Sequence, residues 1–228
     1  MSMFFEEGES SAQPEFIEIL AYPQPAEPLK VSENFYRKME QRRSIRRFSS
    51  RPIQHDVLLN AIRTAGTAPN GANSQPWFFA LIESQELKDR IREDAERVEH
   101  LFYSERASSK CLEDLAKLGT SARKPYLSIA PALIAVFTRH YSSEASAPRS
   151  YYPIESTGIA VGMLLTALHQ VGLASLTHTP RPLNFLNDIL GLDRSFRPFM
   201  LVVTGFPEEP ILVPNIARKP LLEICKVF

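Results

Sequence analysis

Apolar and polar residues follow two different periods along the chain, and these periods predict two kinds of element. Helical patterns predict helices over residues 32–42, 54–65, 86–105, 112–123, 154–171 and 184–190. Short, mostly apolar runs predict buried strands over residues 77–83, 131–138, 173–177 and 200–205. Helices that alternate with short buried strands are typical of an α+β fold, an α/β sandwich in which helices flank a central sheet.

Residues 1–30 differ in composition from the rest of the chain. They carry many acids and prolines, which predicts an extended N-terminal arm, of use if it wraps a partner subunit. Residues 31–228 show no internal repeat and no clear boundary, so we expect a single domain there. Residues 1–8 lack the apolar core of a signal peptide, and no apolar stretch approaches the ~18 residues that span a bilayer. We therefore expect a soluble, cytoplasmic protein.

The charge balance is neutral overall but uneven along the chain. There are 26 basic and 26 acidic residues, and this balance argues against a protein that coats a polyanion. Yet five arginines lie between Arg42 and Arg51. Guanidinium groups match phosphate oxygens well, so the cluster predicts either a phosphate site or a solvated basic face. There is no P-loop and no GxGxxG motif, which disfavours a Walker or Rossmann nucleotide site.

Two further segments could form a ligand site. Small and turn-forming residues over Ala68–Asn73 separate a helix from a strand, and such residues let a flat ligand lie against the backbone. Hydroxyls and His178 cluster over Ser175–Pro180 at a strand end, where ligand sites of α/β proteins often form. Ordinary connecting loops explain both segments equally well. No second ligand lies at metal-binding spacing from His178, so we expect no metal site.

Three charged or polar residues could hold an amino acid. Glu99 and Tyr103 are four residues apart and so share a helical face, and Lys124 follows at the end of the next predicted helix. A Glu, a Lys and a Tyr together can bind the ammonium and carboxylate of an α-amino acid. The alternative is a solvated helix face, which is how most exposed charges behave.

These segments together resemble the nitroreductase superfamily of FMN proteins, and most of all its iodotyrosine deiodinase branch. The matching motifs are RRSIRRF from Arg42, TAGTAPNGANSQPW from Thr64, GMLLTALHQVGLASLTHTP from Gly162 and VPNIARKPL from Val213. The spacing of Glu99, Tyr103 and Lys124 is similar to the substrate lid of halotyrosine deiodinases. The resemblance runs from about Phe35 to Phe228.

The resemblance implies an FMN site and a set of residues that form it. The implied cofactor-binding residues are Arg42, Arg43, Ser44, Arg46, Asn70, Thr177, His178, Thr179 and Arg218. The first four would hold the phosphate, and the Thr179 hydroxyl would lie nearest the flavin N5 and favour one-electron steps. Asn70 and His178 stand where the family often has Ser and Thr.

The resemblance also implies a reaction: FMN-dependent reductive dehalogenation, from iodotyrosine to tyrosine and halide. Glu99 would bind the substrate ammonium, Lys124 its carboxylate, and Tyr103 the same zwitterion. The Ala72 backbone N–H would face the phenolate, so Ala72 and Thr179 are the implied catalytic residues. The implied fold has a central mixed sheet, in an intertwined homodimer with FMN at the interface.

The implied partners are a halotyrosine or related phenolic amino acid, and a reductant that is either NAD(P)H or a separate reductase. Neither a nucleic acid nor a membrane is expected. Three other interpretations stay open. They are a general nitro- or quinone reductase, a non-catalytic flavin-binding protein, and a basic nucleic-acid-binding module built on the arginine cluster. Zero net charge and the scarcity of interleaved aromatics, with Phe48 alone, argue against the nucleic-acid-binding module.

Overall fold

The computed structural model describes residues 16–18, 24–139 and 151–228. The chain divides into two compact units, Met1–Glu40 and Gln41–Phe228, and each is described by itself. The first unit contains helix α1 (Pro28–Glu40). Proline suits the first turn of a helix, where its missing N–H has no partner to lose, so α1 can begin at Pro28. The predicted boundary between residues 30 and 31 therefore falls inside this helix. Most of the predicted arm, and the predicted polar loop at 141–150, lie outside the described residues.

The second unit is built on a four-stranded sheet with the order β1-β2-β4-β3. The strands are β1 (Trp77–Ile82), β2 (Ala132–Arg139), β3 (Ala174–His178) and β4 (Phe196–Gly205). All three neighbouring pairs are antiparallel, which corrects the expected mixed sheet. The one parallel contact among the described residues is an isolated bridge between Ser44 and Ser175.

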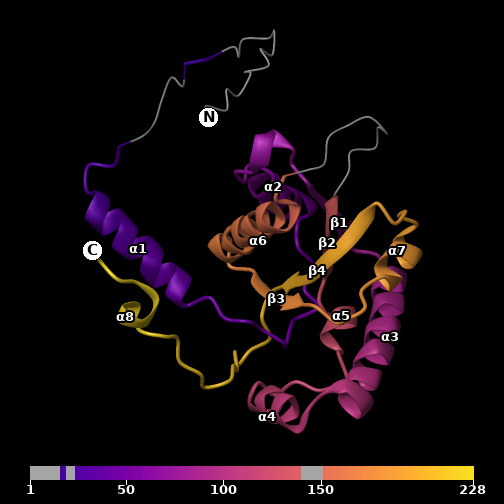
Figure 1. Cartoon of the computed structure of the whole chain (residues 1–228). Helices are drawn as coiled ribbons and strands as arrows, with labels where there is room; N and C mark the ends of the chain where they lie inside the picture. Colours follow the sequence, from indigo (N-terminus) through magenta and orange to yellow (C-terminus); the bar gives the residue numbers. More distant parts are fainter. Residues whose placement is uncertain (1–15, 19–23, 140–150) are drawn as a thin grey trace, which may run out of the picture. The chain divides into compact units, whose positions relative to one another are not determined.

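Helices of the second unit lie on both sides of this sheet (Figure 1). The helices of the unit as a whole are α2 (His55–Ala65), α3 (Gln85–Leu101), α4 (Ser109–Lys117), α5 (Tyr126–Ile129), α6 (Pro153–Gln170), α7 (Phe185–Leu190) and α8 (Leu221–Ile224). Two short turns complete the set: a 3₁₀ turn, η1 (Gly71–Asn73), and a π-helical turn, η2 (Phe102–Arg106). None of the helices within the described ranges has the length and apolar character needed to cross a membrane.

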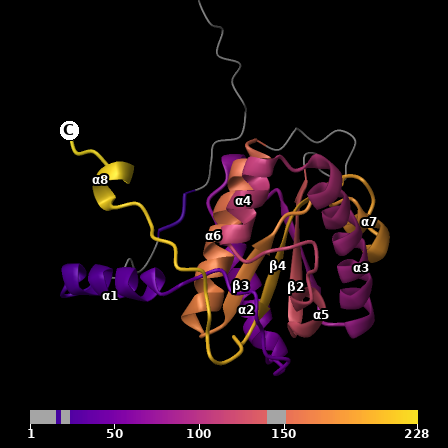
Figure 2. The same ribbon diagram turned by 90° about the horizontal axis from the view of Figure 1, so that it is seen from below.

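The sheet is the middle of three layers, as Figure 2 shows. Alternate side chains of β2 point to opposite faces, and both faces are buried. Ile134 and Val136 pack in the apolar cluster that includes α2 and α6. Leu133 and Phe137 pack in the cluster that includes α3, α5 and α7. A strand buried on both faces reads as a continuous apolar run, which is why β2 is predictable from the sequence.

The ends of several elements differ from the predicted ones. The predicted helix 112–123 is α4, which starts at Ser109 because the Ser108 hydroxyl accepts a hydrogen bond from the Cys111 N–H (3.2 Å). It ends before Gly119, whose φ of +63° is left-handed. Lys124 therefore lies in a loop beyond the helix, and not at its end.

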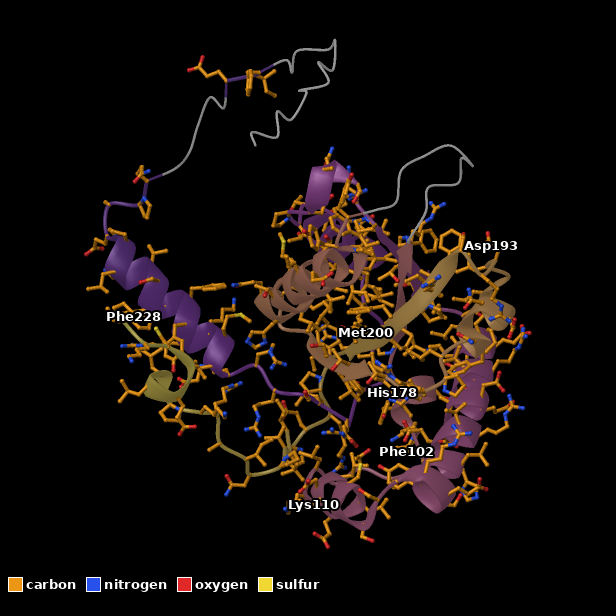
Figure 3. All side chains as sticks on the ribbon, viewed as in Figure 1. Phe102, Lys110, His178, Asp193, Met200 and Phe228 are labelled. Atoms are coloured by element: carbon orange, nitrogen blue, oxygen red, sulfur yellow. The ribbon has the colours of Figure 1, made fainter. Side chains whose placement is uncertain are left out.

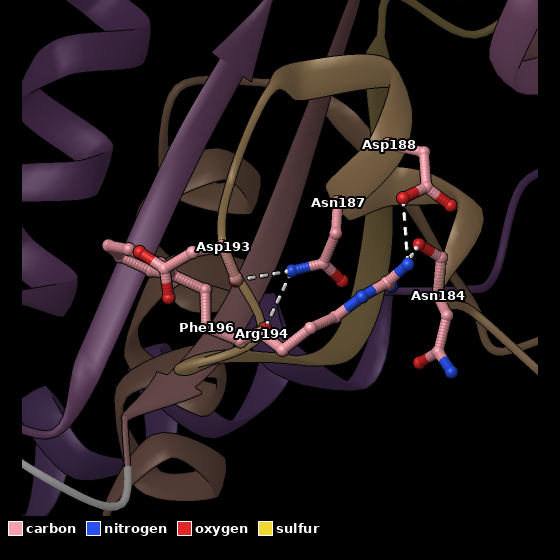
Figure 4. A network of polar contacts seen from close by, with 6 residues as sticks. All are labelled: Asn184, Asn187, Asp188, Asp193, Arg194 and Phe196. Atoms are coloured by element: carbon pink, nitrogen blue, oxygen red, sulfur yellow. Dashed lines mark hydrogen bonds and ion pairs between the residues drawn. The ribbon is translucent and has the colours of Figure 1, made fainter.

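Strand β4 begins at Phe196, earlier than the predicted Met200, and a buried amide supports its start. Asn187 donates hydrogen bonds to the carbonyl oxygens of Asp193 (2.9 Å) and Phe196 (2.8 Å), as Figure 4 shows. In the same network, the guanidinium of Arg194 pairs with the carboxylate of Asp188 (2.8 Å). These contacts join α7 to the first residues of β4.

Candidate functional site

The arginine segment, Arg42–Arg51, runs along the outer edge of β3. The Ile45 N–H donates to the carbonyl of Ser175 (3.2 Å), next to the Ser44–Ser175 bridge. Burial of Ile45 and Phe48 anchors the segment in the core, so the arginines between them are held at the surface. The sequence-predicted Arg42–Arg46 cluster and the end of β3 are thus brought together.

The chain beyond β4 folds back over the arginine segment. Arg43 donates to the Pro214 carbonyl, and Arg218 donates to the Arg42 carbonyl (2.6 Å). These contacts outline a cavity of about 270 Å³. It is lined by Arg42, Arg43, Ser44, Arg46, Leu118, Pro214, Ile216, Ala217 and Arg218. The structure therefore adds Arg218 to the arginine cluster, as predicted from the VPNIARKPL motif.

Like charges gather around this cavity. Burial lowers the pKa of Arg42, and the neighbouring guanidiniums of Arg218 and Arg43 lower it further. Such an arrangement destabilises the charged form of Arg42 until an anion lies among the guanidiniums. The cavity has the donor chemistry of a site for a phosphate group.

A second cluster, the lid cluster, consists of Glu99, Tyr103, Thr120 and Lys124. The Lys124 ammonium lies 3.2 Å from a Glu99 carboxylate oxygen and donates to the Thr120 hydroxyl (3.1 Å). It also lies 5.6 Å from the centre of the Tyr103 ring. The side chains of Lys124 and Glu99 are only 4% and 13% exposed, so this ion pair is buried. The solvated helix face is therefore not what the chain forms here.

The backbone of Lys124 is also fixed by a hydrogen bond to α3. The Glu96 carboxylate accepts a hydrogen bond from the Lys124 N–H (2.6 Å) and pairs with Arg92 (3.0 Å). Burial alone would raise the pKa of Glu96, but these hydrogen bonds outweigh it and lower the pKa. For Lys124, burial lowers the pKa more than the Glu99 carboxylate raises it. Tyr103 has a raised pKa, chiefly because it is partly buried.

The residues at the end of β3 point in alternating directions. Thr177 and Thr179 are exposed, whereas His178 between them is 6% exposed and faces the interior. One ring nitrogen of His178 lies 3.4 Å from the Tyr126 hydroxyl, and the two rings meet edge to face. Burial, with a smaller contribution from Lys124, lowers the pKa of His178 to about 3, so the imidazole is neutral. Figure 3 labels His178, and also Phe102 on η2, the turn that carries Tyr103.

The loop before β1 has an unusual backbone. Ala72, Asn73 and Gln75 have φ values of 51°, 54° and 44°, all in the left-handed region. The Asn70 side chain closes this loop: it accepts a hydrogen bond from the Gln75 N–H (2.7 Å) and donates to the Ala68 carbonyl (3.1 Å). Residues held in such conformations often belong to functional sites.

Not all of the predicted residues lie together within one chain. Arg46 connects the arginine segment with the lid cluster, because its charge acts on both Tyr103 and Lys124. The Ala72 loop, in contrast, precedes β1, at the opposite edge of the sheet from β3. Three strand spacings of about 4.8 Å place these edges about 14 Å apart.

Several residues of the site were not predicted from the sequence. Glu96 and Thr120 fix Lys124, and Tyr126 contacts His178. Glu96 shares the helical face of Glu99 and Tyr103, a spacing that could have pointed to it. No local signal points to Thr120 or Tyr126, because loop path decides their contacts. Among the described residues, no group of three His, Cys, Asp or Glu side chains could hold a metal ion.

Comparisons with known proteins agree with this geometry. The model of the nitroreductase family matches residues 39–206. The chain is 44% identical over 207 residues to the iodotyrosine deiodinase of Haliscomenobacter hydrossis, covering 90% of this chain and 93% of that protein. It is 38% identical over 208 residues to human iodotyrosine deiodinase 1, covering 89% of this chain and 71% of that protein. A crystal structure of oxidized iodotyrosine deiodinase bound to FMN and 3-iodo-L-tyrosine superposes with a TM-score of 0.72 and 32% identity, covering 82% of this chain and 95% of that chain.

Proposed function

Because the chain belongs to the nitroreductase family, in its iodotyrosine deiodinase branch, we propose that it is an FMN-dependent enzyme that removes halogen from halotyrosines. The reaction consumes a halotyrosine, two electrons and one proton, and releases tyrosine and halide. The observation that carries the proposal is the buried Glu99–Lys124 pair beside Tyr103. A general nitroreductase, which takes uncharged aromatic substrates, has no use for such a pair.

FMN fits the arginine-lined cavity by its charge. Arg42, Arg43, Arg46 and Arg218 converge there with the Ser44 hydroxyl, and the burial and like charges that lower the pKa of Arg42 support an anion at this place. The phosphate of FMN supplies that anion, and the exposed hydroxyls of Thr177 and Thr179 lie along the strand next to this segment. The bound flavin supplies the electrons of the reaction.

The lid cluster binds the amino-acid end of the substrate. Without ligand, Glu99 and Lys124 satisfy each other at 3.2 Å. An incoming ammonium replaces Lys124 at the Glu99 carboxylate, and the substrate carboxylate takes the freed Lys124. Tyr103 and Thr120 add neutral hydrogen-bonding groups beside the same ion pair. This exchange closes the lid over the site and excludes water from it.

The Ala72 loop binds the other end of the substrate. Its backbone is held by Asn70, so the Ala72 N–H is available in a fixed direction for a phenolate oxygen. This favours the ionised halophenol over the neutral one. Asn70 thereby acts on the ligand through the loop.

The separation of the Ala72 loop from β3 supports a homodimer. The two lie at opposite sheet edges, about 14 Å apart, which is too far for one aromatic ring to contact both. We propose that the loop of a second copy completes each site. The apolar side chains of Ile154, Ile159, Leu222 and Phe228 are exposed in the second unit, and a partner copy would cover such surface.

The proposal is tested by comparing ligands that differ only at the zwitterion. Iodotyrosine should quench the fluorescence of bound flavin with an affinity at least ~30-fold above that of iodophenol, since losing a desolvated charge contact costs about 2–5 kcal/mol. Under anaerobic conditions, protein that dithionite has reduced should release iodide from iodotyrosine as its flavin is reoxidised. Equal affinity for the two ligands, or faster reaction with a nitroaromatic than with iodotyrosine, would refute the proposal.

A further inference from the structure

A second basic cavity, of about 420 Å³, lies beside the lid cluster. Its wall comes from α3, from the arginine segment, and from the loop between α4 and α5. It is lined by Arg46, Arg47, Arg92, Gly119, Thr120, Ser121, Arg123, Pro125 and Tyr126. Arg46 is the only one of these residues that also lines the cavity assigned to the FMN phosphate. The two cavities are therefore neighbours that share the Arg46 side chain as a common wall.

The charges of this cavity are only partly balanced. Four guanidiniums line it and no carboxylate does. Arg47 pairs with Glu208 (2.9 Å) and Arg92 pairs with Glu96 (3.0 Å), both from outside the cavity wall. In the described part of the chain, the side chains of Arg46 and Arg123 form no direct ion pair or hydrogen bond, although their charges act on nearby titratable groups. Arg46 also lines the cavity assigned to the FMN phosphate, and the charge of Arg123 acts on Glu96, which already pairs with Arg92. Four guanidiniums and only two nearby carboxylates thus leave this concave surface with an excess of positive charge.

We propose that this cavity binds an oxyanion with two or more negative charges, such as inorganic phosphate, pyrophosphate or a phosphate ester. A planar guanidinium offers paired N–H donors that match two oxygens of such a group, and the Ser121 hydroxyl lies exposed among them. A halide, which is a single point charge, uses this donor geometry poorly. A concave site of this size suits a small ligand better than the flat surface of an acidic protein.

The cavity lies next to Lys124, so an anion bound there would act on the loop that carries this residue of the lid cluster. Arg123 is the residue before Lys124, and the charge of Arg46 lowers the pKa of Lys124. An oxyanion bound by Arg123 together with Arg47 and Arg92 would hold the 119–123 loop against the arginine segment and α3. The cavity therefore shares Thr120 with the lid cluster, but not the Glu99–Lys124 pair.

The test uses full-length protein saturated with FMN, so that the phosphate cavity is filled, and titrates it with inorganic pyrophosphate at constant ionic strength. Calorimetry should show one saturable site per chain. Arg123→Gln should weaken pyrophosphate at least tenfold while leaving FMN affinity within twofold of the wild type. Arg90→Gln removes a charge from an exposed position of α3 outside the cavity, and it should change pyrophosphate affinity less than twofold.

Three outcomes would overturn the proposal. The first is an absence of saturable pyrophosphate binding to the FMN-loaded protein. The second is that Arg123→Gln and Arg90→Gln change the pyrophosphate affinity equally. The third is that variants lose pyrophosphate affinity only when they lose FMN affinity as well. Chloride and iodide titrations distinguish the oxyanion from the halide product. If iodide binds more tightly than phosphate, the cavity is a halide site and the inference is wrong.

Discussion

Lys124 and Glu99 form an ion pair 3.2 Å long although they lie 25 positions apart in the sequence, and both side chains are largely buried. Two buried opposite charges that satisfy each other make a site that is neutral when empty. An amino-acid zwitterion is also neutral overall and carries the same two charges. Substrate binding therefore exchanges partners within the site and adds no net charge to it.

Removing one member of this pair should cost more than removing both. We expect Glu99→Gln or Lys124→Met alone to lower the free energy of unfolding by about 3 kcal/mol, because each leaves the other charge buried and unpaired. The double variant should be clearly more stable than the sum of the single effects predicts. Urea denaturation of all four proteins measures this coupling. Additive effects would mean that the two side chains do not interact in solution.

Glu96 should position Lys124 without touching the substrate. Glu96→Ala removes the acceptor of the Lys124 N–H (2.6 Å) and the partner of Arg92. We expect a loss of about 2 kcal/mol in stability and a higher KM for iodotyrosine, with a smaller change in kcat. Glu96→Gln keeps an acceptor oxygen and should recover part of both losses. Glu93→Ala, an exposed position on the same helix, is the control. A positioning role is excluded if KM is the same in all of these variants.

Burial of His178 should make stability depend on pH. The folded protein lowers the pKa of His178 from 6.5 to about 3, so below pH 6.5 the unfolded chain binds a proton that the folded chain does not. The contribution is present above pH 6.5 and is lost progressively as pH falls toward 3. Between pH 7 and pH 5 this residue alone should lower the free energy of unfolding by about 2 kcal/mol.

His178→Asn isolates this contribution. The variant should lose about 2 kcal/mol less than the wild type between the two pH values, as measured by urea denaturation. His100→Asn, at an exposed position of α3, is the control. Identical slopes for the wild type and His178→Asn would show that the imidazole titrates normally in the folded protein.

The proposed dimer can be tested on α6. Gly162 is exposed, and a Cβ built there meets no atom within 4 Å in the single chain. Gly162→Leu should therefore stabilise an isolated subunit by up to about 1 kcal/mol, through helix propensity. If α6 packs against a second copy, the same variant should instead shift the protein to monomer and weaken FMN binding. Light scattering and flavin titration report both effects, and Glu113→Leu on α4 serves as the control.

The strands that are buried as continuous apolar runs could be predicted from the sequence, whereas the interrupted start of β4 could not. Strands β1, β2 and β3 were predicted to within about two residues, because burial leaves a continuous apolar run. The start of β4 was missed, since Arg197 and Pro198 break its apolar run. Pro198 is tolerated there because it lies at an irregularity in the register between β2 and β4.

The region from Phe102 to Lys124 was the least predictable from the sequence. Its helical pattern continues through η2, but the backbone widens there into a π turn, with the Ala107 N–H bonded to the Phe102 carbonyl (2.8 Å). Charge pattern cannot distinguish a solvated helix face from the lid cluster. The path of the loop after Gly119 buries Lys124, and only the family resemblance pointed to its partners. Their roles in substrate binding stay predictions.

The Ser44–Ser175 bridge affects how the protein behaves at high concentration. Strand β3 is an edge of the sheet, and an uncovered edge offers free N–H and carbonyl groups to strands of other molecules. The arginine segment covers part of that edge with its own backbone. The segment proposed to bind the FMN phosphate thus also covers part of an open sheet edge, which should reduce aggregation. Protein that has lost its flavin, with this segment no longer tethered by a phosphate, is the form from which we expect aggregates to grow.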